Sequence, residues 1–257
     1  MRTSKRALLL AGVLVSGMAT AATEPGAGAD WMTWRAADDV TNTASLQRGA
    51  RNFMGYCLGC HSLKYERYSR LGTDIGLTAE ELQKYLIAPG DKPGDYILTT
   101  MPAGDAATWF GKTPPDLSLM ARARGADYLY QFLKTFYVDA SKPTGANNLR
   151  LDSTAMPAVL SELEGLKHAV FKDVQEKSAD GKTMTVHVFD HFEQIAPGRM
   201  SAAEYDAFVH DTVNFLDYVG EPTQAARRAL GIWVVLFLLV FTWLAWLLKQ
   251  QYWKDVH

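Results

Sequence analysis

The stretch Cys57-Leu58-Gly59-Cys60-His61 decides how the rest of this chain is interpreted. It has the C-x-x-C-H pattern of covalent c-type haem attachment, in which two thiols on one turn add to the vinyl groups of one porphyrin. The imidazole that comes next can then bind the iron as the proximal ligand. The chain has two cysteines, both in this motif, so the sequence predicts one haem of this type and no disulfide framework.

Two other kinds of C-x-x-C site are less compatible with the sequence. A closed zinc site needs four ligands, and the chain has no second C-x-x-C motif. A thioredoxin-like dithiol requires a βαβ setting, which the flanking residues do not predict. The motif therefore favours covalent haem attachment.

The N-terminal segment, residues 1–21, is typical of a secretory signal peptide. Basic residues precede an apolar run from Ala7 to Val15, and Ala19-Thr20-Ala21 matches a small-residue cleavage site. The apolar run is too short to span a bilayer. Export agrees with the haem motif, because bacteria attach c-type haem outside the cytoplasm. Residues 22–226 are therefore expected to form a periplasmic haem domain.

The C-terminal segment is long enough to cross a membrane. Ala229 to Leu248 contains no charged residue, and about twenty apolar residues are sufficient for one helical crossing. We predict an anchor over residues 227–250 and a cytoplasmic tail over 251–257. Basic residues flank both ends of the anchor, so the positive-inside rule does not choose an orientation. The signal peptide does, and it predicts a single-pass protein of the bacterial inner membrane.

The charge of the exported domain is mildly acidic. The whole chain has 26 basic and 28 acidic residues. Without the three basic residues of the predicted signal, and without Lys249, Lys254 and Asp255, the remaining residues 22–248 have a net charge of −6. This surface argues against nucleic acid as a partner and is compatible with a basic protein partner. Ordinary solubility explains so small an excess equally well.

The haem domain is predicted to be mainly helical. A helix from Thr43 to Tyr56 is expected to lead into the haem motif. Thr78 and Glu81 form a capping box, which opens a short helix toward Ile87. A second capping box, Ser201 with Glu204, opens a long amphipathic helix that Gly220 and Pro222 end.

The middle of the domain is less regular. Residues 113–120 are expected to enter a helix with Asp116 as its cap, and the expected buried positions are Leu119, Tyr128, Phe132 and Leu133. Lys142 to Arg150 is polar and predicted to be a loop. Between Gly165 and Phe192, alternating residues and the turn signal Asp180-Gly181 predict a small two-stranded β-ribbon.

The residue on the far side of the iron decides what a haem can do. A methionine closes the iron to substrate, whereas an open position allows oxygen or peroxide chemistry. Met101 and Met156 both precede a proline, and the residues alone leave the choice between them open. The histidines outside the motif are expected to lie on the surface.

The chain resembles the cytochrome c1 family over nearly all of the predicted mature protein. The resemblance rests on Tyr56 to Leu63 with Arg67-Tyr68, on Pro114-Pro-Asp-Leu-Ser118 with Arg122-Ala-Arg124-Gly125, on Tyr205-Asp206 and Val213 to Leu216, and on Gly220-Glu-Pro222 before one terminal anchor. It implies a mainly α, class I cytochrome c-like haem domain with a small β-ribbon insertion and one transmembrane helix. The chain differs from many members at Ala107 to Lys112, where they have an asparagine-rich loop.

The resemblance also implies the roles of particular residues. Cys57 and Cys60 would attach one haem c, and His61 and Met156 would bind its iron. Met101 would then line or pack the site. Arg124, in preference to Arg122, would bind a haem propionate, because a guanidinium pairs well with a carboxylate. Pro115 would contact the cofactor.

The implied function is electron transfer within the quinol–cytochrome c reductase (cytochrome bc1) complex. The chain would take electrons from the Rieske iron–sulfur protein and pass them to a mobile cytochrome c, without being an enzyme by itself. It would dock against cytochrome b in a dimeric membrane complex. The alternative is a membrane-anchored cytochrome that donates electrons to a terminal oxidase. A haem enzyme or gas-binding protein with an open iron is a further, different class.

Overall fold

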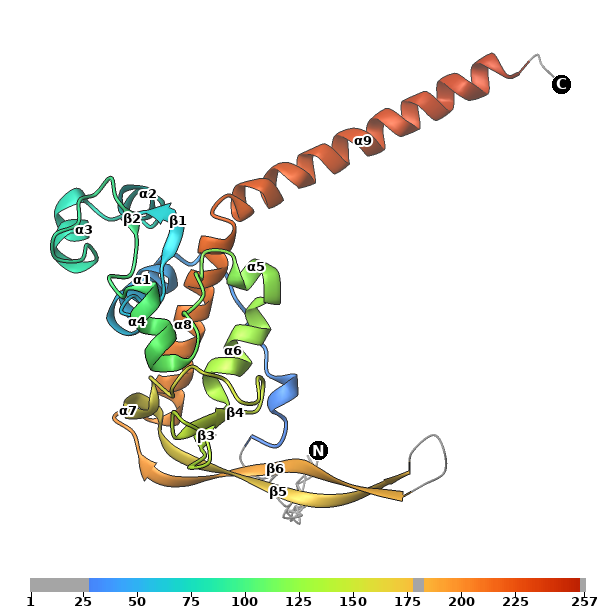
Figure 1. Ribbon diagram of the computed structural model, residues 1–257. Coiled ribbons are helices and arrows are strands. Elements are labelled where there is room, and N and C mark those ends of the chain that lie inside the picture. The colour runs from blue at the N-terminus through green and yellow to red at the C-terminus, as the bar shows by residue number, and fades with distance from the viewer. Residues whose placement is uncertain (1–27, 178–182, 255–257) are drawn as a thin grey trace, which may run out of the picture.

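The computed structural model describes residues 28–177 and 183–254 of the chain (Figure 1). The predicted signal peptide and the predicted turn Asp180-Gly181 lie outside these residues.

Two helices cross at the centre of the domain. They are α1 (Thr43–Tyr56), capped by the side chain of Asn42, and α8 (Ala202–Gly220), which begins with the predicted Ser201–Glu204 capping box. Gly49 makes the crossing possible, since a Cβ there would overlap the carbonyl oxygen of Asp211 on α8. The predictions for both helices are confirmed.

The crossing is held by polar contacts as well as by apolar packing. Phe53 of α1 packs against Phe215 of α8, with the two ring centroids 5.8 Å apart. Arg48 Nε donates to Asp211 Oδ2 at 2.5 Å, and Ser45 Oγ donates to Asp211 Oδ1 at 2.6 Å. Because α1 ends one residue before Cys57, this packing fixes the point from which the haem motif starts.

Shorter elements surround the two central helices. In chain order they are η1 (Trp31–Thr33), β1 (Leu63–Arg67), α2 (Tyr68–Asp74), α3 (Ala79–Tyr85), β2 (Tyr96–Ile97), α4 (Ala103–Phe110), α5 (Met120–Arg124), α6 (Ala126–Lys134), β3 (Phe136–Val138), β4 (Ala146–Asn148) and α7 (Ser161–Glu164). The pairs β1–β2 and β3–β4 are antiparallel. The capping box of α3 is present as predicted.

The predicted ribbon is an antiparallel hairpin that extends from the domain (Figure 1). Its strands are β5 (Gly165–Lys177) and β6 (Thr183–Pro197), which makes it longer than predicted. Three of the histidines outside the motif lie on it. His187 pairs with Asp173 and His191 pairs with Asp190, while His168 is exposed.

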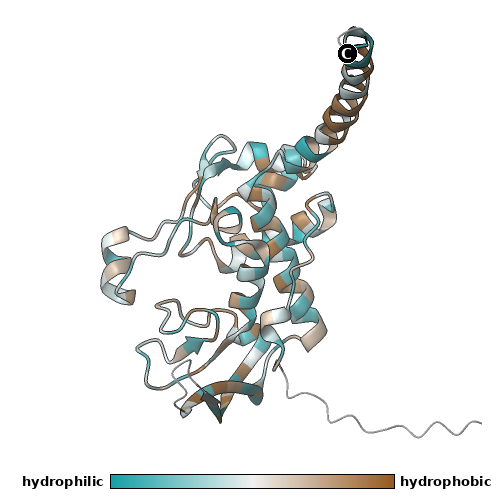
Figure 2. Cartoon of the chain, turned by 90° about the vertical axis from the view of Figure 1, so that its right-hand side faces the viewer, coloured by the Kyte–Doolittle hydropathy of each residue, from teal (hydrophilic) through white to brown (hydrophobic). Residues whose placement is uncertain are grey.

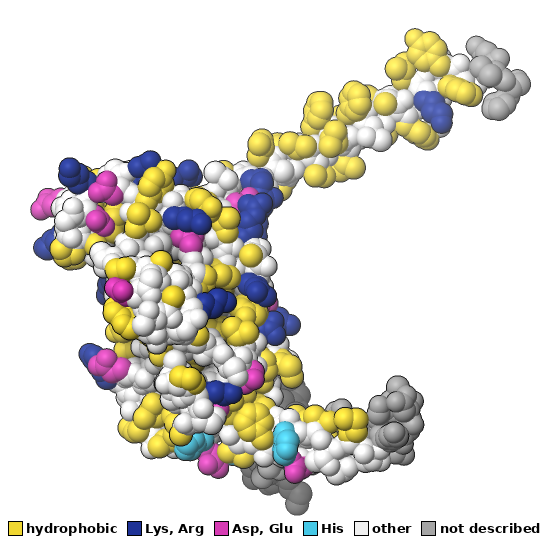
Figure 3. Space-filling model, in the orientation of Figure 1, with side chains coloured by type: hydrophobic (Ala, Val, Ile, Leu, Met, Phe, Trp, Pro, Cys, Tyr) yellow, Lys and Arg dark blue, Asp and Glu magenta, His cyan; other side chains and the backbone are white. Residues whose placement is uncertain are grey.

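The last helix, α9 (Gln224–Tyr252), leaves the domain as a single rod (Figure 1). It is long and apolar enough to cross a membrane, and none of its most apolar stretch is buried in the protein. Figures 2 and 3 show hydrophobic residues along nearly its whole length. It starts three residues before the predicted anchor and ends two residues after it.

Three predictions made from the sequence are wrong. Asp116 does not cap the following helix, which begins at Met120, and its carboxylate instead bonds to backbone N–H groups. Leu119 is 47% exposed rather than buried. The stretch predicted to be a loop before Arg150 contains β4, whose partner strand β3 could not be inferred from its polar residues.

Candidate functional site

The haem motif forms a tight turn at the end of α1. Cys57 N–H still donates to Phe53 O at 2.9 Å, as in the helix. The N–H groups of Cys60 and His61 then both donate to Cys57 O, at 3.0 and 2.8 Å. The two thiols and the imidazole are therefore carried on one turn, as attachment to one porphyrin requires.

Burial sets the protonation of the motif's side chains. It raises the pKa of Cys57 to about 12, with a smaller contribution from Cys60, so the Cys57 thiol is protonated at neutral pH. Burial also lowers the pKa of His61, although the hydrogen bond to Pro115 and the charge of Asp116 act in the opposite direction. The imidazole is therefore neutral, which is the form that binds a metal.

The orientation of His61 is set by one backbone contact. Its Nδ1 lies 2.7 Å from Pro115 O. A carbonyl oxygen can only accept, so Nδ1 carries the proton and Nε2 keeps its lone pair. Metal-binding histidines typically donate their other ring N–H to such an acceptor. The donor set of the motif thus fits the iron of a covalently attached haem.

Residues 61–65 and 115–118 are joined by further hydrogen bonds, and we call these contacts the proximal seam. Leu117 N–H donates to Ser62 O at 2.9 Å, and Lys64 N–H donates to Asp116 Oδ2 at 2.8 Å. Tyr65 N–H donates to Ser118 Oγ at 3.2 Å. The seam holds the Pro-Pro-Asp-Leu-Ser segment beside the haem motif, so two of the motifs singled out in the sequence lie together.

The two candidate methionines are both half-buried and lie in irregular backbone. Met101 N–H donates to Thr99 Oγ1 at 3.2 Å. Met156 N–H has a longer contact, 3.4 Å, with Thr154 Oγ1. That Met156 is the iron ligand stays a prediction.

The two candidate arginines belong to different surroundings. Arg124 lies over the ring of Tyr128, 5.6 Å from its centroid. Arg122 faces Glu221, with 3.8 Å between Nη1 and Oε2, and Glu221 also binds Arg227 at the start of α9. Arg122 therefore contacts the junction between the domain and α9, which favours Arg124 as the candidate for the propionate.

Comparison with known proteins identifies the family of the chain. A family model described as Cytochrome C1 family matches residues 34–256. The chain is 44% identical over 219 residues to cytochrome c1 of Allochromatium vinosum, which covers 85% of this chain and 87% of that protein. The chain belongs to the cytochrome c1 family.

Two other relatives have similar coverage. The ammonia monooxygenase gamma subunit of Nitrosomonas europaea is 44% identical over 219 residues, or 85% of this chain and 86% of that protein. Cytochrome c1 of Rhodospirillum rubrum is 31% identical over 283 residues, or 98% of this chain and 97% of that protein.

Membership of the cytochrome c1 family identifies the cofactor that the motif carries. Family members carry a covalently bound haem c, and Cys57 and Cys60 are the thiols of the matching motif. The chain is a c-type cytochrome of the cytochrome bc1 complex, an electron-transfer subunit. Among the described residues, one helix is suited to a membrane.

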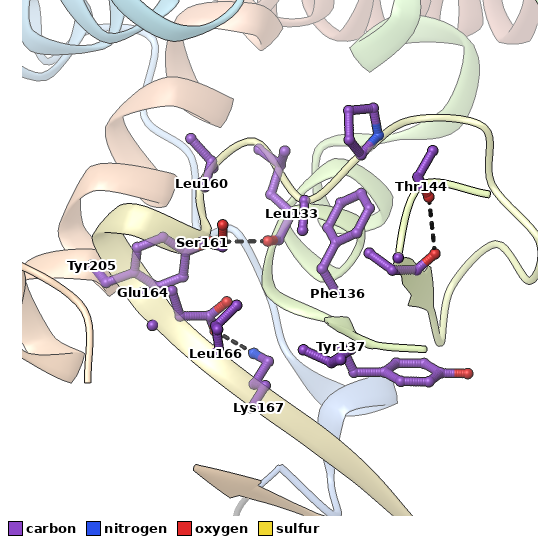
Figure 4. Close-up of a pocket in the computed structure, with 16 residues that line it drawn as sticks. Leu133, Phe136, Tyr137, Thr144, Leu160, Ser161, Glu164, Leu166, Lys167 and Tyr205 are labelled. Atoms are coloured by element: carbon purple, nitrogen blue, oxygen red, sulfur yellow. Dashed lines mark hydrogen bonds and ion pairs between the residues drawn. The ribbon is translucent and has the colours of Figure 1, made fainter. Parts of the chain in front are cut away.

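A cavity of about 210 Å³ is lined in part by the residues that follow Met156 in the chain (Figure 4). Pro157, Ala158 and Leu160 form part of its lining, and Leu133 and Phe136 face them. On its far side, Lys167 pairs with Glu164. The residues that follow Met156 therefore border a cavity.

The sequence did not point to Thr99. Its Oγ1 donates to Gly59 O at 3.0 Å, and its N–H donates to Ser62 Oγ at 2.9 Å. Both contacts join residues 37 to 40 positions apart, and no local pattern around Thr99 predicts them. The role of Asp116 was missed for the same reason, because its local spacing suggested a helix cap.

Proposed function

We propose that this chain takes electrons from the Rieske iron–sulfur protein and passes them to a mobile cytochrome c. The observation that carries the proposal is the orientation of His61, whose Nδ1 is bound to Pro115 O so that Nε2 can bind iron. The single apolar helix that follows α8 supports an electron carrier held at a membrane.

The proposed roles of the residues follow from their chemistry. Cys57 and Cys60 would hold the haem through thioether bonds, and His61 and Met156 would be its axial ligands. Arg124 would pair with a propionate, with Arg122 as the less favoured candidate, and Pro115 would orient His61. When bound, haem c supplies a one-electron couple. The protein has to position and shield that couple, and no side chain need act as acid or base.

The arrangement in the membrane is also part of the proposal. Residues 1–21 would be removed as a signal peptide, 22–226 would form the periplasmic domain, 227–250 the anchor and 251–257 the cytoplasmic tail. The anchor would dock against cytochrome b in a dimeric complex. Tethering keeps the haem domain close to its electron donor and so raises the effective concentration of the pair.

Purification of the tagged chain from its native membrane tests the proposal. We expect cytochrome b and a Rieske protein to copurify, quinol to reduce the haem c of the complex, and added mobile cytochrome c to reoxidise it. A double variant, Cys57→Ser with Cys60→Ser, should lack the haem c absorbance. Copurification with a terminal oxidase in place of cytochrome b would contradict the proposal and favour the alternative donor role.

A further inference from the structure

Asp116 makes two hydrogen bonds that haem attachment by itself does not require. Its Oδ2 accepts from Lys64 N–H at 2.8 Å, and its Oδ1 accepts from Ser118 N–H at 3.0 Å. One carboxylate thus joins the strand after the haem motif to the segment that contains Pro115. Asp116 is half-buried, so these bonds are partly shielded from water.

The bond from Lys64 closes a ring of contacts that includes the candidate iron ligand. Starting at His61, three residues lead to Lys64, whose N–H reaches Asp116. Asp116 follows Pro115 directly, and Pro115 O returns to His61 Nδ1 at 2.7 Å. Any shift of the Asp116 backbone moves the Pro115 carbonyl, since the two residues share a peptide bond.

We propose that Asp116 is a positioning residue of the haem site: its carboxylate holds the Pro115 carbonyl on His61 Nδ1 and thereby lowers the reduction potential of the haem iron. The inference rests on the proposed function in one respect, namely that His61 is an iron ligand. Asp116 acts through His61 and Pro115 rather than by contact with the reacting atoms.

Two physical effects act in the same direction. A hydrogen bond from Nδ1 to a fixed acceptor makes the other ring nitrogen a stronger donor, which favours the more positively charged oxidised iron. The negative charge of the carboxylate, close to the imidazole, also favours the oxidised state. Loss of either effect therefore raises the potential.

Asp116→Asn is the direct test, made in the full-length haem protein. An amide has one acceptor oxygen and one NH2 group, so it cannot accept from both Lys64 and Ser118 in the present geometry. We expect normal haem content and a higher midpoint potential. At a fixed applied potential, the ratio of oxidised to reduced haem should fall roughly five-fold. The electron paramagnetic resonance spectrum of the oxidised protein should shift as well, since it reports the ligand field of the imidazole.

Asp95→Asn is the matched control. Asp95 Oδ2 accepts from Lys92 N–H at 2.8 Å in a loop outside the proximal seam, so this variant loses the same charge and a similar bond. Its potential should equal that of the wild type. A full haem content with unchanged potential and spectrum in Asp116→Asn would overturn the inference.

A second variant covers the case in which Asp116→Asn does not assemble. Asp116→Glu keeps the charge but has a longer side chain, so its carboxylate cannot accept from both Lys64 N–H and Ser118 N–H in the present geometry. We expect a smaller rise in potential, and an unchanged potential would again overturn the inference. If the wild-type protein itself lacked a histidine-ligated low-spin spectrum, the proposed function would fail instead, which separates the two failures.

Discussion

The two sides of the candidate haem site are built differently. On the His61 side, residues 59–65 are bonded to residues 35 to 55 positions away, through Thr99 and the proximal seam. On the Met156 side, the hydrogen bonds of residues 154–159 that the structure describes are all local, and the residues that follow Met156 border a cavity. The protein itself thus fixes the position of His61, whereas the proposed bond from the Met156 sulfur to the iron would fix that of Met156.

The largest effect is expected at the crossing of α1 and α8, which positions the His61 side of the site. In Gly49→Val, the new side chain would overlap the backbone of Asp211 and the Cβ of Phe215, so α1 and α8 could not cross as they do. We expect a loss of stability of about 3 kcal/mol or more, with little haem-bearing protein recovered. Haem content and urea unfolding measure this effect.

Gly55→Ala is the control for that variant. Gly55 lies on the same helix, and no atom lies within 4 Å of a Cβ added there. Alanine should leave the protein unchanged or stabilise it by up to about 1 kcal/mol through its helix propensity. Equal losses in the two variants would show that the crossing has no special need of Gly49.

The next prediction concerns the buried side chain of Glu66, which follows the His61 side in the chain. Glu66 of β1 is 2% exposed, and its Oε1 has no hydrogen-bond partner among the described residues. Burial raises its pKa to about 7, although Arg70 acts in the opposite direction. In the unfolded chain the pKa is about 4.3, so the folded protein binds the proton more tightly. The contribution of Glu66 to stability is therefore present at low pH and lost as the pH rises toward 7 and above.

Glu66→Gln should remove this pH dependence. We expect the variant to be more stable than the wild type at pH 8, by on the order of 3 kcal/mol, and close to the wild type near pH 4. Urea unfolding of the detergent-solubilised protein, followed by haem absorbance, gives both values. Glu80→Gln, at an exposed position of α3, should show the slope of the wild type. Parallel slopes for wild type and Glu66→Gln would contradict the prediction.

The smallest expected effect compares the two sides directly. Thr99→Val removes a hydroxyl that donates to Gly59 O and accepts from Met101 N–H. Thr154→Val removes a hydroxyl with one contact, at 3.4 Å, to Met156 N–H. We expect the first variant to lose about 1–2 kcal/mol and the second less than about 0.5 kcal/mol. Equal losses in unfolding experiments would show that the two sides are equally constrained.

The same contrast explains what the sequence could predict. Both capping boxes, the central helices and the apolar C-terminal helix depend on neighbouring residues, and these predictions are confirmed by the structure. Thr99 and Asp116 act across long separations through backbone groups, which leave no trace in local patterns. Asp116 in particular has the spacing of a helix cap, and only the folded chain brings Lys64 to its carboxylate. The assignment of Met156 rests on the resemblance to the family, and its role stays a prediction.

Carbon monoxide binding to the reduced protein tests the central claim, that His61 and Met156 close the iron for electron transfer. The wild type should be low-spin and should not bind carbon monoxide, because both axial positions are filled. Met156→Leu should open the distal position and bind carbon monoxide readily, whereas Met101→Leu should behave as the wild type. A Met156→Leu protein that still excludes carbon monoxide, beside a Met101→Leu protein that binds it, would contradict the claim.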